Sequence, residues 1–276
     1  MNVIAKRIAA LLAAILILVT SAVAEEMNVL LIGLDTEESP GRSDTMLLAR
    51  IQPEEGRVQL ISFLRDLYVP IPGHGSTRLN AAYFYGGEAL LRQTLQENFG
   101  VSIHRSATVR FSTLKWLVDE LGGVTVDVTD DERKHMNKLL KAGGNGHMQL
   151  PESGTQLLNG PQALAYSRIR KLDSDFQRTK RQQRVLTALL PPMSQKGVFA
   201  LTRLAIALMG QVDTDMTLAD LATFAPLLTQ LDSLTIETAQ VPFEGAYQDA
   251  TVDGMMVLKP DLKKNRQLLA DFLAQE

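Results

Sequence analysis

The sequence predicts an α/β domain in which helices are layered on a β-sheet, and three observations support this prediction. The continuous apolar run Asn28–Leu34 is typical of a strand that is buried on both faces. The segments Thr45–Ile51 and Val58–Leu64 have strand composition and are separated by a turn at residues 53–56. Beyond them, helical patterns alternate with short β-branched runs, which indicates helices packed on a sheet.

The remaining elements follow from periodicity and capping residues. A helical pattern opens at Gly86-Gly87 and runs to Phe99, while Ser112 and Thr217 are predicted as N-caps of later helices. The polar stretch 129–154 is predicted to be a partly helical excursion over the surface. Further helices are predicted at 113–121, 160–166, 176–190, 198–209, 218–231 and 261–273, and further strands at 106–111, 124–128 and 233–241.

Composition limits the classes of function. A chain of 276 residues with 45% hydrophobic and 21% charged residues predicts one globular domain plus a leader. The net charge of -3 argues against nucleic-acid binding through bulk electrostatics. Cysteine is absent, which excludes disulfides, thiolate nucleophiles and cysteine-ligated zinc. The four histidines form no metal-binding motif, so a histidine-ligated zinc site is not expected either.

The N-terminus predicts export. Lys6 and Arg7 precede an uncharged run, Ile8–Ala24, that ends in Ala22-Val23-Ala24. A basic start, an apolar middle and a small-residue end are typical of a signal peptide, and an uncleaved membrane anchor is the alternative. We therefore expect residues 1–26 to be a leader and residues 27–276 to be the domain. The domain is expected at the extracytoplasmic face of the membrane, or secreted after cleavage.

Two aspartates flank the first two strands. Asp35 follows the first strand and Asp44 precedes the second. If these strands are antiparallel neighbours, their connected ends bring both carboxylates together as ligands for a hard cation of the Mg²⁺ kind. The alternative is that each aspartate caps a turn.

Arginines recur at the ends of other elements. Arg65 follows the third strand, and Arg78 precedes Asn80, which could cap a helix and aim backbone N–H groups at an anion. Taken singly, each arginine is more often a solvated surface residue.

The segment 165–184 is the richest in arginine. Arg168 and Arg170 share one side of an extended chain, and in a helix Arg178, Arg181 and Gln182 share a face. Several guanidinium groups on one surface suit a pyrophosphate. The alternative is an exposed basic helix that touches anionic lipid or nucleic acid, but the aspartates within the segment favour a structured site.

These segments together resemble the LytR–CpsA–Psr family of cell-envelope proteins. The matching blocks cover most of residues 28–190 and follow the family's order. They are Leu30-Leu31-Ile32-Gly33-Leu34-Asp35, Arg42-Ser43-Asp44-Thr45, Arg65-Asp66-Leu67-Tyr68-Val69, Arg78-Leu79-Asn80-Ala81-Ala82-Tyr83 with Gly86-Gly87, and 163–170 leading to 181–183. Two positions depart from the family's pattern. Phe63-Leu64 stands where members commonly have proline before Arg65, and Arg78 is often lysine.

The resemblance implies a single-domain α/β/α sandwich with a central mixed sheet. It implies a Mg²⁺-dependent, or Mn²⁺-dependent, phosphotransferase that moves a phosphate-linked glycan from a polyprenyl-(pyro)phosphate carrier to peptidoglycan. Asp35 and Asp44 would bind the metal. The catalytic residues would be Arg65, Arg168, Arg170 and Asp175, with Asp175 assisting the incoming hydroxyl, and the substrate-binding residues would be Arg42, Arg78, Asn80, Arg178, Arg181 and Gln182.

The expected partners are the polyprenyl-linked donor, the peptidoglycan acceptor and membrane lipid, with no nucleic acid. For the lipid tail, we expect an apolar slot lined by the helices at 90–99 and 198–209, and the alternative is that these apolar faces pack in an ordinary core. Two other functions stay open: a protein that binds the lipid-linked glycan without turning it over, and a transcriptional attenuator. The predicted leader and the negative charge argue against the attenuator.

Overall fold

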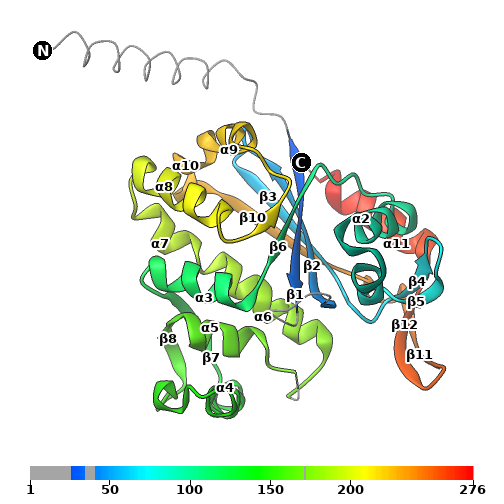
Figure 1. The fold of residues 1–276 in the computed structure, drawn as a ribbon, viewed down its shortest axis with the longest axis horizontal. Helices are drawn as coiled ribbons and strands as arrows, with labels where there is room; N and C mark the ends of the chain where they lie inside the picture. The colour runs from blue at the N-terminus through cyan, green and yellow to red at the C-terminus, as the bar shows by residue number, and fades with distance from the viewer. Residues whose placement is uncertain (1–25, 35–40, 171, 276) are drawn as a thin grey trace, which may run out of the picture.

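The computed structural model describes residues 26–34, 41–170 and 172–275. Its centre is a six-stranded sheet with the order β10-β3-β2-β1-β6-β9 (Figure 1). The pairs β10–β3 and β1–β6 are parallel, and the other neighbouring pairs are antiparallel. The sheet is therefore mixed, as predicted. Its strands are β1 (Met27–Leu34), β2 (Ser43–Gln52), β3 (Arg57–Phe63), β6 (Arg105–Val109), β9 (Asp213–Thr214) and β10 (Thr235–Val241).

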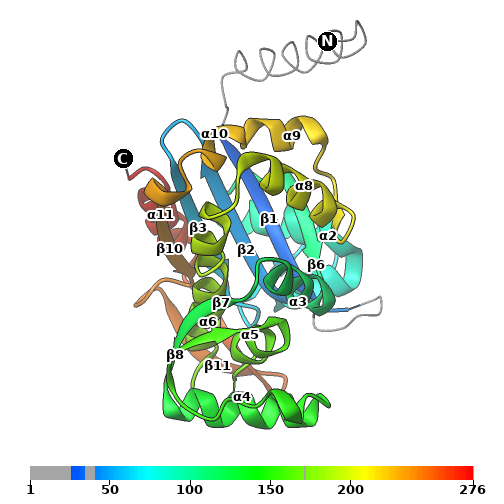
Figure 2. The ribbon, with the colours of Figure 1, turned by 90° about the vertical axis from the view of Figure 1, so that its left-hand side faces the viewer.

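Helices cover both faces of the sheet, which confirms the predicted α/β/α sandwich (Figures 1 and 2). One face packs against α2 (Asn80–Phe99) and α11 (Leu262–Leu273). The other face carries α3 (Phe111–Glu120), α5 (Gly160–Ser167), α6 (Asp175–Thr187) and α8 (Val198–Met209). The remaining α-helices are α4 (Asp130–Ala142), α7 (Leu190–Ser194), α9 (Leu218–Thr223) and α10 (Ala225–Leu228). The hairpins pair β4 (Tyr68–Ile71) with β5 (Gly75–Arg78), β7 (Val124–Val128) with β8 (Gly154–Leu158), and β11 (Tyr247–Val252) with β12 (Met255–Pro260).

Two large hydrophobic cores result from this layering, and a third, smaller cluster contains Leu47, Ala49 and Leu60. The first lies between the sheet and the helices α2 and α11, and includes Leu30, Leu91 and Leu269. The second lies among α3, α4, α5, α6 and the β7–β8 hairpin, with the fully buried Tyr166 as its largest side chain. Gly160 lets α5 approach α3 closely, because a Cβ atom there would lie 2.4 Å from the Lys115 carbonyl oxygen. The second core thus fixes α5 and the residues that follow it.

Several predicted helix boundaries differ from the structure. Helix α2 begins at Asn80, before the predicted start at Gly86-Gly87. These two glycines have non-helical backbone angles and form a kink inside the helix. The N-cap of α3 is Arg110, so the assignment of Ser112 as N-cap was wrong. Thr217 does cap α9, accepting a hydrogen bond from the Asp220 N–H at 3.2 Å. The helix predicted at 218–231 is interrupted after Thr223 and resumes at Ala225 as α10, with Pro226 in its first turn.

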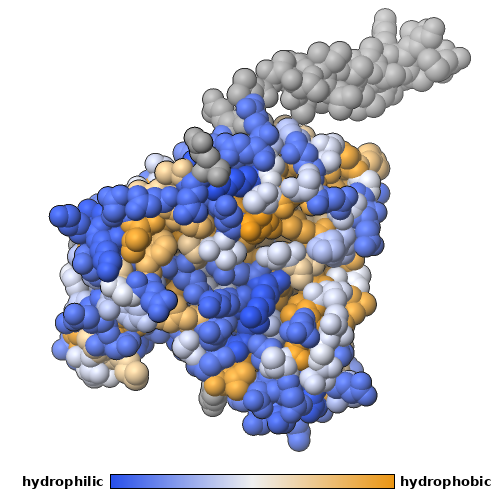
Figure 3. Space-filling view, turned by 180° about the vertical axis from the view of Figure 1, so that it is seen from behind, coloured by the Kyte–Doolittle hydropathy of each residue, from blue (hydrophilic) through white to orange (hydrophobic). Residues whose placement is uncertain are grey.

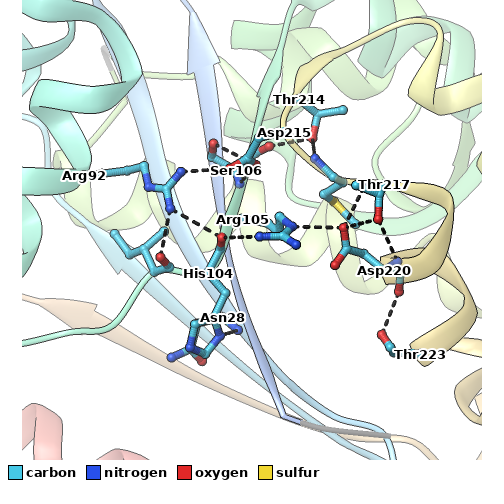
Figure 4. Close-up of polar contacts among 12 residues, drawn as sticks. Asn28, Arg92, His104, Arg105, Ser106, Thr214, Asp215, Thr217, Asp220 and Thr223 are labelled. Atoms are coloured by element: carbon cyan, nitrogen blue, oxygen red, sulfur yellow. Dashed lines mark hydrogen bonds and ion pairs between the residues drawn. The ribbon is translucent and has the colours of Figure 1, made fainter. Parts of the chain in front are cut away.

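A polar network joins α2, β6, β9 and α9 (Figure 4). Arg92 Nη1 lies 2.9 Å from a carboxylate oxygen of Asp215, whose other oxygen accepts a hydrogen bond from the Ser106 N–H at 2.6 Å. Arg105 Nε donates to Asp220 at 2.9 Å, and the Thr217 hydroxyl donates to the same carboxylate at 2.7 Å. The bond from Arg105, assisted by those from Thr217, lowers the pKa of Asp220 to about 2.

The substitution Asp220→Asn should reduce the free energy of unfolding by about 1–2 kcal/mol at neutral pH, after screening of the half-exposed Arg105 is allowed for. Because the folded-state pKa lies below the ordinary value, the contribution is complete above about pH 4 and disappears as the pH falls towards 2. Urea unfolding of both proteins across this range should show their difference shrinking at low pH. A difference independent of pH would contradict the assignment, and Asp249→Asn, at an exposed position, is the control.

Candidate active site

The connected ends of β1 and β2 form one side of the site. The two strands are antiparallel neighbours in which Leu34 pairs with Ser43, after a register shift beyond Gly33. This confirms the strand arrangement on which the predicted aspartate pair depends, and it places Asp44 at the beginning of the central strand β2. Asp35 lies outside the described residues, so the pairing of Asp35 with Asp44 stays a prediction.

Three chain segments bring opposite charges together around Asp44. Arg65, which follows β3, donates from Nη1 to Asp44 Oδ1 at 2.5 Å. Arg178, on α6, donates from Nη2 to the Asp44 carbonyl oxygen at 3.1 Å and lies 2.9 Å from Asp175 Oδ1. Arg65 Nε is 3.9 Å from the same Asp175 oxygen. Asp44, Arg65, Asp175 and Arg178 therefore form one connected cluster, which we call the charge cluster.

The charge cluster continues towards Arg78 through Asp66. Asp66 Oδ2 lies 3.5 Å from Arg65 Nε, and its Oδ1 lies 3.3 Å from Arg78 Nε. Arg78 also donates from Nη2 to the Met256 carbonyl oxygen at 2.5 Å. Asn80 is buried nearby and donates its backbone N–H to the Arg65 carbonyl oxygen at 3.2 Å. The predicted capping role of Asn80 is wrong, because Leu79 is the N-cap of α2 and no side chain caps it.

Burial shapes the electrostatics of the charge cluster. It lowers the pKa of Arg178, against the attraction of Asp175, and it raises the pKa of Asp175 above its ordinary value despite Arg178 and Arg65. Burial of Arg65 disfavours its charge as well, but the ion pair and hydrogen bond with Asp44 raise the pKa of Arg65. Burial thus favours the protonated form of Asp175 relative to an exposed aspartate.

Unsatisfied polar atoms concentrate in this region. Among the described residues, ten buried side-chain nitrogen and oxygen atoms have no hydrogen-bond partner, and seven of these belong to Ser43, Arg65, Asp66, Arg78, Asn80, Asp175 and Arg178. Buried polar atoms normally find partners. The guanidinium Nε groups fit a phosphate, and the carboxylate oxygens fit a hard cation. In the described part of the chain, no group of three or more His, Asp or Glu side chains is arranged to hold a metal.

A cavity of about 550 Å³ adjoins the charge cluster. Asp44 and Arg178 both line it, and so do Arg168, Arg170 and Gln182. The rest of the wall is largely apolar and comes from β1, β2 and the helices α3 to α6, including Leu31, Leu47, Phe111, Leu114, Leu139, Leu164, Val185 and Leu186. Arg168 is held over the Phe111 ring, with Cζ 4.4 Å from its centroid. Charged and polar side chains thus form one part of the wall of a largely apolar cavity. A cavity of this kind suits an amphipathic ligand.

This position corrects the predicted lipid slot. None of the residues at 90–99 or 198–209 lines the large cavity. Helix α2 instead packs into the first core through Leu91 and Leu95, while α8 is mostly exposed. Helix α4, which the sequence prediction left within a surface excursion, supplies Leu139 to the wall. The capping box of Thr129 and Glu132, which is present in the structure, was the signal that would have located α4.

Arg181 does not belong to the site. Its Nε donates to Glu132 Oε1 at 2.8 Å, and its terminal nitrogens donate to Asp173 and to the Ile169 carbonyl oxygen. These bonds occupy the guanidinium group of Arg181. Arg181 therefore has a structural role in place of the predicted contact with phosphate. Gln182 lies about 40° from Arg178 around the helix and lines the cavity with it, whereas Arg181 lies about 60° to the other side.

Arg42 lies beside the charge cluster in sequence, directly before Ser43 and Asp44. Its side chain is exposed, and its Cζ lies 5.8 Å from the centroid of the Phe84 ring. Phe84 in turn contacts Tyr85 edge to face. Arg42 thus projects from the loop before β2 towards the beginning of α2, outside the cavity wall.

The chain is similar to proteins of one known family. A family model described as the LytR_cpsA_psr family matches residues 13–271. The chain belongs to the LytR–CpsA–Psr family. It is 32% identical over 217 residues to the polyisoprenyl-teichoic acid–peptidoglycan teichoic acid transferase TagT of Bacillus subtilis, covering 76% of this chain and 66% of that protein. It is 29% identical over 258 residues to the regulatory protein MsrR of Staphylococcus aureus, covering 91% and 75%.

Solved LytR–CpsA–Psr structures share the fold. A structure of TagT bound to LIIa-WTA superposes with a TM-score of 0.74 at 28% identity, covering 91% of this chain and 92% of that one. TagT with bound octaprenyl pyrophosphate lipid superposes with a TM-score of 0.69 at 27% identity, covering 91% of each chain. The predicted family and fold are therefore confirmed, while the role of each site residue stays a prediction.

Proposed function

We propose that this protein transfers a phosphate-linked glycopolymer from a polyprenyl pyrophosphate carrier to peptidoglycan. The observation that carries the proposal is the apolar cavity whose wall includes Asp44 and Arg178 of the charge cluster. A chamber of this kind suits an isoprenoid chain, and the arginines suit its pyrophosphate. The TagT relative is named as a teichoic acid transferase, and one TagT structure contains a polyprenyl pyrophosphate lipid.

The chemistry follows from the groups present. The acceptor hydroxyl forms a new bond to the phosphorus that carries the glycan, and the bond from that phosphorus to the bridging oxygen breaks. Polyprenyl phosphate leaves, and the hydroxyl proton passes to Asp175, whose raised pKa suits a proton acceptor. Arg65, Arg168, Arg170 and Arg178, with Arg42 and Arg78 around them, neutralise the phosphate charge.

We include a divalent cation at this site in the same proposal. Asp44 and Asp35 would hold Mg²⁺ or Mn²⁺, which would withdraw charge from the pyrophosphate when bound. Asp44 lines the cavity. The domain would act at the extracytoplasmic face of the membrane, where the leader predicted at residues 1–26 delivers or anchors it. Among the described residues, no helix has both the length and the apolar character needed to span a bilayer.

The test of the proposal is a transfer assay with the full chain. It uses a polyprenyl pyrophosphate-linked glycan, peptidoglycan fragments and Mg²⁺, and it measures release of polyprenyl phosphate together with labelled peptidoglycan. Both products are expected, and chelation of the metal should abolish them. Tight binding of the lipid-linked glycan without turnover would identify a binding protein instead.

A substitution that fills the cavity should weaken lipid binding. Leu164→Trp places an indole where the wall meets the isoprenoid chain, displacing roughly two to four methylene groups. At about 0.8 kcal/mol each, affinity for polyprenyl pyrophosphate should fall about 10- to 200-fold. Isothermal titration would measure this, with Leu157→Trp, at a position 65% exposed and outside the cavity, as control. Unchanged affinity of the Leu164→Trp protein would show that the tail binds elsewhere.

A further inference from the structure

Helix α8 is apolar yet mostly exposed. Its sequence, VFALTRLAIALM, contains one charged residue, and Leu201 is its only buried side chain. Phe199 is 78% exposed and Ile206 is 51% exposed. Among the described residues, eight large hydrophobic side chains are exposed, and four of them, Val198, Phe199, Ile206 and Leu218, lie in α8 or at the start of α9. Such a concentration of exposed apolar side chains in two elements indicates an interaction site.

Basic side chains lie within this apolar surface. Phe199, Arg203 and Ile206 share one stripe of α8, on the side away from Leu201, because they are four and three residues apart. Lys196 precedes the helix by two residues, and no aspartate or glutamate occurs between residues 195 and 212. Lys196 and Arg203 form no ion pair with any residue that the structure describes. Both cations are therefore available to an external anion.

A shallow pocket of about 270 Å³ lies between α3 and α8. Trp116, Lys196 and Arg203 line it, together with Ala200, Leu204 and Ala207, and Glu120 is its one acidic residue. Trp116 is the only tryptophan of the chain. Tryptophan with lysine or arginine is the combination that proteins place at the membrane–water interface, where the indole meets the headgroups and the cations meet phosphate.

The location of α8 agrees with this chemistry. Helices α8 and α9 lie at the end of the molecule where β1 begins, in both views of the ribbon (Figures 1 and 2). The leader predicted at residues 1–26 joins the domain at that end. The edge that carries α8 appears at the upper right of Figure 3, where a few hydrophobic residues lie among hydrophilic ones.

We propose that α8, with Trp116, Lys196, Arg203 and Leu218, docks the domain on an anionic phospholipid bilayer. Phe199 and Ile206 would enter the interface, while the two cations bind lipid phosphate. A second copy of the chain is a poorer occupant of this surface. In a two-fold dimer through α8, the same basic stripe would face itself and its charges would repel.

Trp116 is a built-in probe for the experiment. The full chain is reconstituted into phosphatidylcholine vesicles with or without phosphatidylglycerol, with bromine on the acyl chains, and Trp116 fluorescence is recorded. Because bromine quenches only at short range, a domain that is merely tethered keeps its emission. We expect strong quenching with phosphatidylglycerol. Lys196→Gln with Arg203→Gln should shift the docking equilibrium about fivefold per charge removed, and Phe199→Glu should abolish quenching.

Matched variants decide the outcome. Leu157→Glu and Met256→Glu replace equally exposed hydrophobic residues elsewhere and should quench like the unchanged protein. Thermal unfolding of every variant confirms that the fold is intact. Absence of quenching in anionic vesicles would overturn the proposal. It would also be overturned if Phe199→Glu converted a dimer to a monomer while leaving quenching unchanged, since α8 would then be a subunit interface.

Discussion

Asp44→Asn should reduce glycopolymer transfer by about 10²- to 10³-fold while leaving the fold intact. Asp44 accepts a hydrogen bond from Arg65, and Arg178 Nη1 lies 3.8 Å from its second carboxylate oxygen. The amide has nearly the same shape but no charge, so the ion pairs of residue 44 with Arg65 and Arg178 are lost. It is also a much weaker ligand for the proposed cation.

The measurement is the rate of transfer at saturating lipid-linked donor, with affinity for the donor measured separately. The proposal requires a large loss of turnover with a smaller change in donor affinity. Asp249→Asn, at an exposed position on β11, serves as the control for removal of one carboxylate. Transfer by the Asp44→Asn protein at the rate of the unchanged protein would remove Asp44 from the mechanism and from the metal site.

Asp175→Asn should lower turnover by about 10²- to 10⁴-fold and alter its pH dependence. Burial raises the pKa of Asp175, against the pull of Arg178 and Arg65. As a proton acceptor, Asp175 must be ionised, so activity of the unchanged protein should rise as the pH increases through this raised pKa. The residual activity of the Asp175→Asn protein should lack that rise.

The pH profile separates two roles of Asp175. Asp175 Oδ2 also accepts a hydrogen bond from Arg178 Nη2 at 3.0 Å. Removal of the carboxylate could therefore lower turnover by displacing Arg178. A merely positioning role would lower turnover but leave the shape of the profile unchanged. Asp131→Asn, on α4 with a side chain 70% exposed, is the control and should retain both rate and profile.

The sequence contained enough to predict the sheet and the charge cluster. The apolar run of β1 and the two strand patterns after it indicated adjacent antiparallel strands. The charged residues at the ends of these strands indicated where the site lies. Arg65, Asp175 and Arg178 converge because each lies at the end of an element or one turn into it.

The cavity and the role of Arg181 could not be predicted in the same way. A hydrophobic pattern identifies an apolar face without showing whether that face packs in a core, lines a cavity or stays exposed. The helices α2 and α8 have such faces, yet one packs in the first core and the other is exposed. Arg181 shares a helix with Arg178, and only the tertiary position of Glu132 showed which arginine turns away from the cavity.

The most direct test is a crystal structure of this protein with a polyprenyl pyrophosphate and Mg²⁺. The proposal predicts the isoprenoid chain within the cavity lined by Leu139 and Leu164, and the pyrophosphate within hydrogen-bonding distance of Arg178 and Arg168. The cation should contact Asp44. A lipid bound outside this cavity, or a pyrophosphate remote from Arg178 and Asp44, would contradict the proposal.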